Sequence, residues 1–193
     1  MSLSRSRREA THERIVDAAA RDVRRNGYSG VGVADVMAKA GLTHGGFYAH
    51  FDSRDAMLAE AVERAGKDSA ATLAARIEAR RAHGVSAFRA LVEQYLSDAH
   101  LASVDRGCVV AALASEMPRQ PASLRKASAE RVRGLVAMVQ QALPDTAVKA
   151  EATVIAATLV GTLQLARALA PLGEGKAMLA HARRALIDRY DAG

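Results

Sequence analysis

The sequence is short of aromatic residues, cysteine and proline, and each shortage narrows the structures that it can form. Its 193 residues include no Trp, four Tyr, three Phe, one Cys and four Pro. A single cysteine excludes an internal disulfide framework and fits a reducing compartment. Half of the residues are hydrophobic but only 4% are aromatic, so most of the core must consist of Ala, Leu and Val. Because strand-like alternation is nearly absent, we expect an all-α fold.

Long hydrophobic runs are also missing. The N-terminal segment SLSRSRREATHER has no apolar core of the kind that a signal sequence contains. The most apolar run, residues 152–166, is short for a membrane span and contains Thr, Gly and Gln. We therefore expect a soluble, cytoplasmic protein that has no membrane partner.

Motifs for catalysis and cofactor binding are absent from the sequence. It contains no GxSxG, P-loop or dinucleotide fingerprint, and its six histidines form no HExxH-like pair. One alternative is a metal or redox site that joins His100 and Cys108, which flank a predicted loop. A buried and inert Cys108 is the ordinary interpretation. We expect no enzyme, no metal and no cofactor.

The charge of the chain fits a nucleic-acid partner but does not identify one. The formal net charge is +6, and residues 1–50 carry eight Lys or Arg against five Asp or Glu, which places +3 there. Residues 1–10 are polar and basic. They fit either a frayed terminus or an arm whose Arg5, Arg7 and Arg8 lie along phosphates.

Residues 33–51, VADVMAKAGLTHGGFYAHF, have the pattern of a helix-turn-helix. The spacing of apolar residues predicts helices over 11–25, 33–40 and 44–51. Gly41 suits the tight turn between the last two, because glycine accepts the left-handed geometry after a helix. Thr43 is placed to cap the third helix.

The third predicted helix would present small residues to a partner. At about 100° per residue, Phe47 and Phe51 share its inner face and Gly45 lies opposite them. Adjacent Gly45 and Gly46 cost about 1 kcal/mol each relative to Ala in a helix, so an interaction must offset them. An ordinary helical hairpin would need neither these glycines nor an exposed Tyr48. We therefore expect this helix to enter the major groove of DNA.

Residues 27–58 carry a longer pattern. It consists of Gly27-Tyr28, Val33, Asp35-Val36, Ala38, Ala40-Gly41-Leu42-Thr43, Gly45, Phe47-Tyr48, His50-Phe51, Ser53-Arg54 and Leu58. With these residues the segment closely resembles the DNA-binding domain of the TetR/AcrR family of bacterial transcriptional regulators. The resemblance implies a homodimer of nine- or ten-helix subunits, a palindromic double-stranded DNA operator and a small-molecule inducer. Beyond the N-terminal third, only the length and the helical layout match.

The resemblance also implies a set of DNA contacts. By position, Thr43, Tyr48 and His50 would touch phosphates, His44, Gly45 and Gly46 would face base edges or backbone, and Arg54 would reach a phosphate from the next helix. The chain departs from the family pattern at Val31-Gly32, where Thr-Ser is usual, and at residues 44–46, where Lys followed by Gly-Thr is frequent. The operator preference is therefore not transferable.

The expected organisation is an N-terminal helix-turn-helix domain, 1–52, and a helical ligand-binding and dimerisation domain, 53–193, with nine or so helices in all. A helix capped by Asp52-Ser53 should run to about Arg80. The later helices are expected from about residue 84, over 108–117, 123–143, 146–169 and 175–190.

Candidates for the ligand pocket are apolar residues with a few polar groups among them. They are Phe88, Leu91, Tyr95, Cys108, Leu113, Met117, Val136 and Met138. With few aromatic residues and no obvious buried charge, they favour an uncharged, hydrophobic inducer.

Candidates for the dimer interface lie on the last two helices. Residues 152–166 carry no charge, and their small side chains permit close helix approach. We expect an isologous four-helix contact, with an internal core helix as the alternative. The interface candidates are Ile155, Leu159, Leu163, Leu179 and Leu186.

The predicted function is thus a ligand-responsive transcriptional regulator, a repressor that binds its operator as a dimer and is released by a small hydrophobic inducer. The alternative is an all-helical interaction protein without sequence-specific DNA binding. Gly41, the Gly45-Gly46 pair and Tyr48 favour the regulator.

Overall fold

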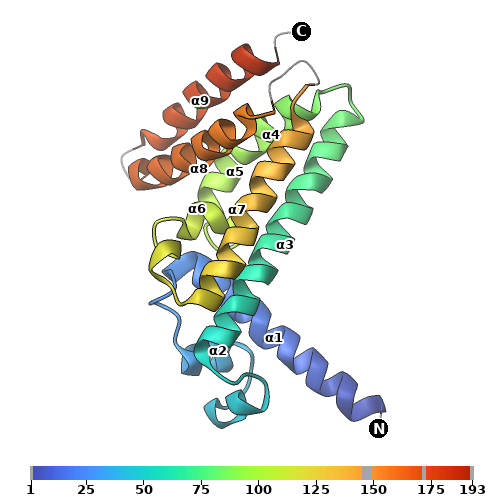
Figure 1. Cartoon of the computed structure of the whole chain (residues 1–193), viewed down its shortest axis with the longest axis vertical. Helices are drawn as coiled ribbons and strands as arrows, with labels where there is room; N and C mark the ends of the chain where they lie inside the picture. The colour runs from blue at the N-terminus through green and yellow to red at the C-terminus, as the bar shows by residue number, and fades with distance from the viewer. Residues whose placement is uncertain (1, 145–148, 171–172, 192–193) are drawn as a thin grey trace. The chain divides into compact units, whose positions relative to one another are not determined.

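The fold is all-α, as predicted. The computed structural model describes residues 2–144, 149–170 and 173–191, and within them it contains nine α-helices, two short 3-10 helices and no strand (Figure 1). The helices are α1 (Ser2–Asn26), α2 (Val33–Lys39), η1 (His44–Ala49), α3 (Arg54–Arg81), α4 (Ala87–Tyr95), α5 (Asp98–Ala102), α6 (Val109–Leu113), η2 (Met117–Arg119), α7 (Ala122–Ala142), α8 (Glu151–Leu169) and α9 (Gly175–Tyr190).

Most predicted helices are confirmed, and three differ from the prediction. α1 begins at Ser2 rather than near residue 11, because residues 2–10 contain no Gly or Pro to stop the helix. α6 ends at Leu113, and Pro118 lies in the separate 3-10 turn η2. The third predicted helix, expected over 44–51 to read DNA and called the reading helix below, is the 3-10 helix η1 instead of an α-helix. The predicted helix start at Thr146 and the break at Pro171-Leu172 lie outside the described residues.

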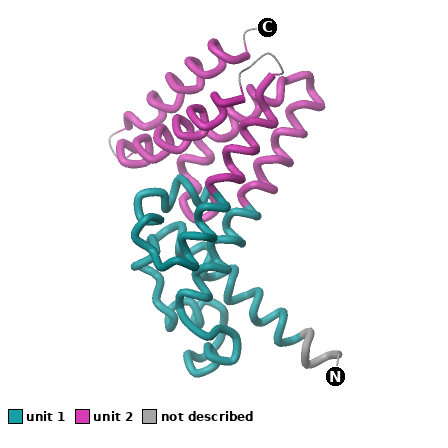
Figure 2. Tube along the Cα trace, viewed as in Figure 1, with its two compact units in different colours: residues 1–68, 108–131 teal, residues 69–107, 132–193 magenta. Residues whose placement is uncertain are grey.

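Contacts divide the chain into two compact units (Figure 2). Unit 1 contains the residues up to 68 together with 108–131, and unit 2 contains 69–107 together with 132 onwards. The division passes through α3 and α7. Packing therefore groups α6, η2 and the start of α7 with the N-terminal helices, an arrangement that sequence patterns did not indicate. The domain boundary between residues 52 and 53 stays a prediction.

The core of unit 1 is a three-helix arrangement of α1, α2 and η1 supported by the first turns of α3. Its fully buried side chains come from every one of these elements. They include Ile15, Val23, Val36, Met37, Phe47, Met57, Leu58 and Val62. Because α1 contacts both α2 and α6, it is the element on which this unit is assembled.

The core of unit 2 is largely aliphatic. Helix α9 packs against both α8 and α4, and Leu159, Leu163 and Leu179 are completely buried there. Phe88 meets Tyr190 edge-on with ring centroids 5.7 Å apart. This packing buries one face of α8 and leaves the other to solvent.

Candidate nucleic-acid interface

The turn before η1 has the geometry that the sequence predicted. Gly41 has φ +71°, in the left-handed region, where a side chain would be strained. Its N–H donates to the Ala38 carbonyl at 3.0 Å, and the Leu42 N–H donates to the Met37 carbonyl at 2.9 Å. These two bonds close the C-terminus of α2 and set the direction in which η1 leaves it.

Thr43 is the residue that precedes η1, as predicted, but its side chain does not cap the helix. Its carbonyl accepts from the Gly46 N–H at 3.1 Å, an i to i+3 bond that makes the turn a 3-10 helix. The hydroxyl is therefore not consumed by the helix end. Thr43 is exposed.

The inner face of η1 is aromatic, as the helical projection predicted. Phe47 and Phe51 are buried and stack with ring centroids 5.6 Å apart. His12 from α1 stacks on Phe51 at 4.5 Å. The ring of His12 also lies 2.7 Å from a Glu60 carboxylate oxygen on α3. The reading helix is thus fixed to α1 and, through His12, to α3.

The outer face of η1 is exposed, and its contact with the inner face is the edge-on packing of Tyr48 on Phe47, with ring centroids 5.3 Å apart. Tyr48 is 73% exposed, and His44, Gly45 and Ala49 are exposed as well. A Cβ added at Gly45 would meet nothing within 4 Å, and one at Gly46 would make only ordinary contact with Met37 at 3.6 Å. Neither glycine is required by the packing of the described residues around it.

His50 lies at the end of η1 between the buried and exposed faces. Within the described part of the chain, its Nδ1 is buried and has no hydrogen-bond partner. Burial lowers the pKa of His50 below its usual range, and His12 and Arg8 lower it further. Arg8 also donates to the Ala49 carbonyl at 2.6 Å, which brings a cation to the end of the reading helix.

Arg54, predicted to contact a phosphate, has a contact inside the protein. Its Nε donates to the Val31 carbonyl at 2.9 Å, and its Nη2 donates to the Tyr28 carbonyl. The guanidinium therefore holds the connector between α1 and α2. A phosphate contact from Arg54 stays a prediction.

The same connector is held from a distant part of the sequence. The Tyr28 N–H donates to a Glu116 carboxylate oxygen at 3.0 Å, and the Tyr28 hydroxyl lies 2.7 Å from the Ser128 hydroxyl. Gly27 has φ +72°, and a Cβ on it would lie 2.4 Å from a Glu116 oxygen. We call Tyr28, Glu116 and Ser128 the connector clasp.

The clasp was missed by sequence reasoning because its members are 88 and 100 residues apart. The signal that could have found it is a serine, Ser128, in the middle of an amphipathic helix; in the structure it is 1% exposed. Burial also raises the pKa of the Tyr28 hydroxyl, so the tyrosine is neutral. The clasp therefore fixes the backbone of the connector between α1 and α2 through one carboxylate and a pair of hydroxyl groups.

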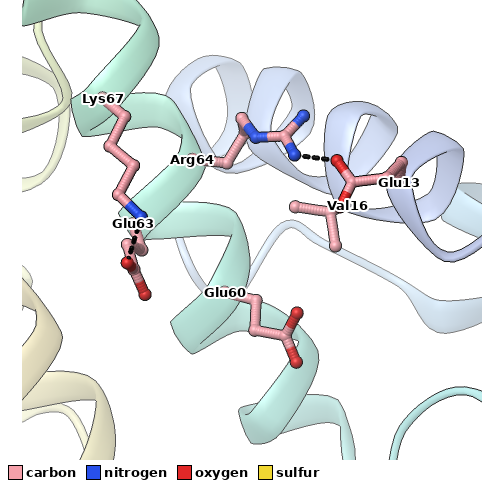
Figure 3. A pocket seen from close by; sticks show the side chains of 6 residues that line it. All are labelled: Glu13, Val16, Glu60, Glu63, Arg64 and Lys67. Atoms are coloured by element: carbon pink, nitrogen blue, oxygen red, sulfur yellow. Dashed lines mark hydrogen bonds and ion pairs between the residues drawn. The ribbon is translucent and has the colours of Figure 1, made fainter. Parts of the chain in front are cut away.

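A polar hollow of about 180 Å³ lies between α1 and α3 (Figure 3). Its walls are already paired: Arg64 binds Glu13 and Asp17, and Lys67 binds Glu63 at 2.5 Å. None of the predicted pocket residues lines it. Its charge does not suit the hydrophobic inducer expected from the sequence.

The residues predicted for an apolar ligand pocket are distributed over both units. Phe88, Leu91 and Tyr95 are buried on α4 in unit 2, where Val136 and Met138 are half-buried, whereas Cys108, Leu113 and Met117 belong to unit 1. The pocket stays a prediction. No group of three or more His, Cys, Asp or Glu placed to hold a metal is found among the described residues.

The five residues predicted for a dimer interface face the interior of their own chain. Ile155, Leu159, Leu163 and Leu179 are completely buried, and Leu186 is 7% exposed. The larger aliphatic side chains of α8 thus fill the core of unit 2, and the dimer interface stays a prediction. The exposed face instead carries Val154 and Leu165, each 58% exposed.

Comparison with known families assigns both parts of the chain. Residues 15–61 match a model described as bacterial regulatory proteins of the tetR family, and residues 84–186 match a model of the tetracyclin repressor-like C-terminal domain. The chain belongs to the TetR family. It is therefore a DNA-binding transcriptional regulator and not an enzyme.

Solved structures of other TetR-family proteins have the same fold. E. coli NemR in its reduced form is 20% identical with a TM-score of 0.73, over 93% of this chain and 96% of that chain. Regulators from Chloroflexus aurantiacus J-10-FL and Agrobacterium tumefaciens are each 22% identical, with TM-scores of 0.71 and 0.70, over 94% and 95% of this chain and 94% and 98% of theirs. At these identities the likeness shows the fold alone. No curated protein matches the sequence.

Helix α8 is long and apolar enough to cross a membrane by length and composition, with a mean hydropathy of 1.5. The expectation that this segment is too short was based on a narrower run and does not hold for the whole helix. A core helix of a soluble protein passes the same test. TetR-family regulators are soluble DNA-binding proteins, and a single helix of this kind does not make this one a membrane protein.

Proposed function

We propose that this TetR-family protein is a homodimeric repressor of bacterial cytoplasm that binds a palindromic operator and leaves it when a small hydrophobic inducer binds. The observation that carries the proposal is the outer face of η1. It is exposed and bare at Gly45, where an added Cβ would meet no described atom within 4 Å. A backbone this bare can approach the floor of the major groove closely.

The residues around that face suit phosphate contacts. Tyr48 and the Thr43 hydroxyl are exposed on either side of the glycine pair, and His50 and Arg8 are at the end of η1. Phosphate contacts set the register of a protein on the duplex, while base edges give it specificity. His44 and the backbone at Gly45 and Gly46 are then the groups that read sequence.

A palindrome needs two copies of the reader, and the exposed face of α8 provides a surface for pairing. Val154, Ala157, Thr158, Gly161 and Leu165 recur along this helix at the spacing of one face. A Cβ on Gly161 would meet nothing within 4 Å in its own chain, so a second helix has room to approach. Two copies of such a face form an isologous interface.

Release requires that the inducer bind one conformation of the dimer better than the other, since equal affinity would shift nothing. The candidate pocket residues of unit 2, Phe88, Leu91, Tyr95, Val136 and Met138, are mostly apolar, which favours a hydrophobic inducer. The connector clasp gives the C-terminal part of the chain a direct hold on the backbone between α1 and α2. Movement of Glu116 or Ser128 would therefore displace the connector before α2 and, with it, the helix-turn-helix.

The proposal is tested by selecting bound duplexes from a random DNA pool and sequencing them. A repressor of this kind should enrich a palindrome, and Tyr48→Ala should weaken its binding at least tenfold. Because Tyr48 is 73% exposed, the variant should melt like the wild type. Val104→Ala, another exposed apolar residue, is the matched control. Failure to enrich any sequence would favour the alternative, an all-helical interaction protein without sequence-specific DNA binding.

A further inference from the structure

We propose that the outward face of α1 is a second DNA-binding surface, an arginine track that follows the phosphate backbone beyond the groove read by η1. The inference rests on the proposed function. The track is defined by Arg7, Arg14 and Arg21, which are all exposed. It does not include any residue of the helix-turn-helix contact set.

The spacing of the track places its members on one face of the helix. They are seven residues apart, which is two helical turns, so each lies about 20° from the last. The opposite face holds Ile15, Ala19 and Val23, which are completely or almost completely buried. From Arg7 to Arg21 the track is about 21 Å long, the axial length of about six phosphates on one DNA strand.

Two of the three arginines of the track have no direct partner among the described residues. Arg14 and Arg21 make no ion pair or hydrogen bond through their side chains within the described residues. Three of the four acids of the same helix pair with other helices: Asp17 and Glu13 bind Arg64 of α3. Asp22 binds Lys39 of α2 at 2.6 Å. The guanidinium groups of Arg14 and Arg21 are therefore available to an anionic partner.

The N-terminal part of α1 supports the same conclusion. Helix N-termini carry a partial positive charge and are stabilised by Asp or Glu. The first turn of α1 contains no acidic residue, and Arg7 and Arg8 lie in the second turn. This order opposes the helix dipole and is unfavourable for the free protein. It becomes favourable when an anion lies along the helix.

Duplex DNA fits the track better than a membrane surface does. A helix that binds a membrane needs a free apolar face, whereas the apolar face of α1 is buried in the core of unit 1. Arginine offers a planar fork that matches phosphate oxygens, and all three positions use it rather than lysine. The expected partner is thus the phosphate backbone of DNA that flanks the operator.

The test compares a short duplex, the operator selected by the wild-type dimer, with the same operator extended by 12 base pairs on each side (a designed length, roughly one helical turn). Fluorescence anisotropy gives both affinities over a range of salt. The extension should strengthen wild-type binding. Arg14→Gln/Arg21→Gln should remove that gain, leave binding of the short duplex unchanged, and lower the salt slope on the long duplex by about 2, since each lost phosphate contact removes about 0.9.

The matched control is Arg125→Gln/Arg184→Gln, which removes the same charge from exposed positions on α7 and α9. It should bind both duplexes like the wild type. If flanking DNA adds nothing to wild-type affinity, or if both double variants lose equally, the track is overturned while the proposed function stands. If the wild type binds no duplex at all, the proposed function fails and the track fails with it.

Discussion

The outer faces of η1 and α8 are both exposed, yet their chemistry is opposite. Along η1 the exposed groups are His44, Gly45 and Tyr48, which offer backbone and polar atoms. Along α8 they include Val154 and Leu165, and the helix carries no charge between residues 152 and 166. The first face suits a hydrated, charged polymer and the second suits another apolar surface.

The supports beneath these faces differ in the same way. Under η1 the rings of Phe47 and Phe51 stack. Directional polar contacts hold the connector before α2: Arg54 binds two carbonyls, and Tyr28 binds Glu116 and Ser128. Under α8, aliphatic side chains such as Leu159 fill the core without a polar partner. The comparison indicates that DNA binding by η1 depends on how the helix-turn-helix is positioned, whereas pairing through α8 depends on a face that carries no charge.

Charge on the α8 face should produce the largest effect. Val154→Glu/Leu165→Glu would bury unpaired carboxylates in the proposed dimer, at a cost of about 3–5 kcal/mol. The dissociation constant of the dimer should therefore rise more than about 100-fold. Analytical ultracentrifugation should detect a folded monomer, because both side chains are 58% exposed in the single chain.

A matched control tests whether the position matters rather than the charge. Val132, on α7, is 40% exposed, and Val132→Glu should leave the dimer intact. If Val154→Glu/Leu165→Glu sediments as the wild type does, a different face of the chain pairs. If both variants dissociate the dimer, added charge acts non-specifically.

The clasp in unit 1 should show the next largest effect. Ser128→Ala leaves the buried Tyr28 hydroxyl without the partner that lies at 2.7 Å, which costs about 1–3 kcal/mol of unfolding free energy. Denaturant titration should measure it. Adding Tyr28→Phe to Ser128→Ala should restore part of the loss, because both polar groups are then gone; an additive further loss would contradict a direct bond.

Local patterns were enough to predict the helices, the turn and the inner face of the reader. Gly41 takes the positive φ that its position demanded, and Phe47 and Phe51 are buried together as their spacing required. Each of these features depends on residues within a few positions of one another. Even the departure of η1 from α-helical geometry is local, since it follows from the bond between Thr43 and Gly46.

Long-range contacts were not predictable in this way. The interface candidates on α8 were chosen for size, but whether Leu159 or Leu165 faces inward depends on where α9 packs. Arg54 was assigned to a phosphate, although its nearest acceptors are carbonyls 23 and 26 residues away. Periodicity shows that a helix has two faces and leaves open which neighbour covers each one.

The pH dependence of the two interfaces should also differ. The pKa of His50 is lowered in the free protein by burial, His12 and Arg8, whereas a phosphate beside it would favour the protonated ring. The DNA complex then takes up a proton, so DNA affinity should rise as the pH falls, by at most about tenfold per pH unit. Dimerisation through the α8 face, which has no histidine, should not change.

Anisotropy measurements from pH 8 down to pH 6 (chosen roughly to bracket the ordinary range of histidine) would check this prediction. His50→Gln should flatten the slope of DNA affinity against pH, and an unchanged slope would assign the effect to another group. In the free protein the lowered pKa has the opposite consequence. The unfolding free energy should fall as the pH drops below the ordinary value of 6.5, because the unfolded chain takes up the proton first.

Replacing a single glycine by alanine should have the smallest effect, and it distinguishes a glycine retained for DNA binding from one without that role. Gly45 on η1 and Gly134 on α7 both have space for a Cβ, so Ala should stabilise the free protein at either position, by up to about 1 kcal/mol. Only Gly45→Ala should weaken operator binding, because its methyl group projects where the groove floor would lie. A variant that melts higher and binds DNA less well would show that Gly45 is retained for the partner rather than for the fold. Equal DNA affinity in both variants would mean that the reader tolerates side chains on its outer face, and base contacts would then have to come from His44.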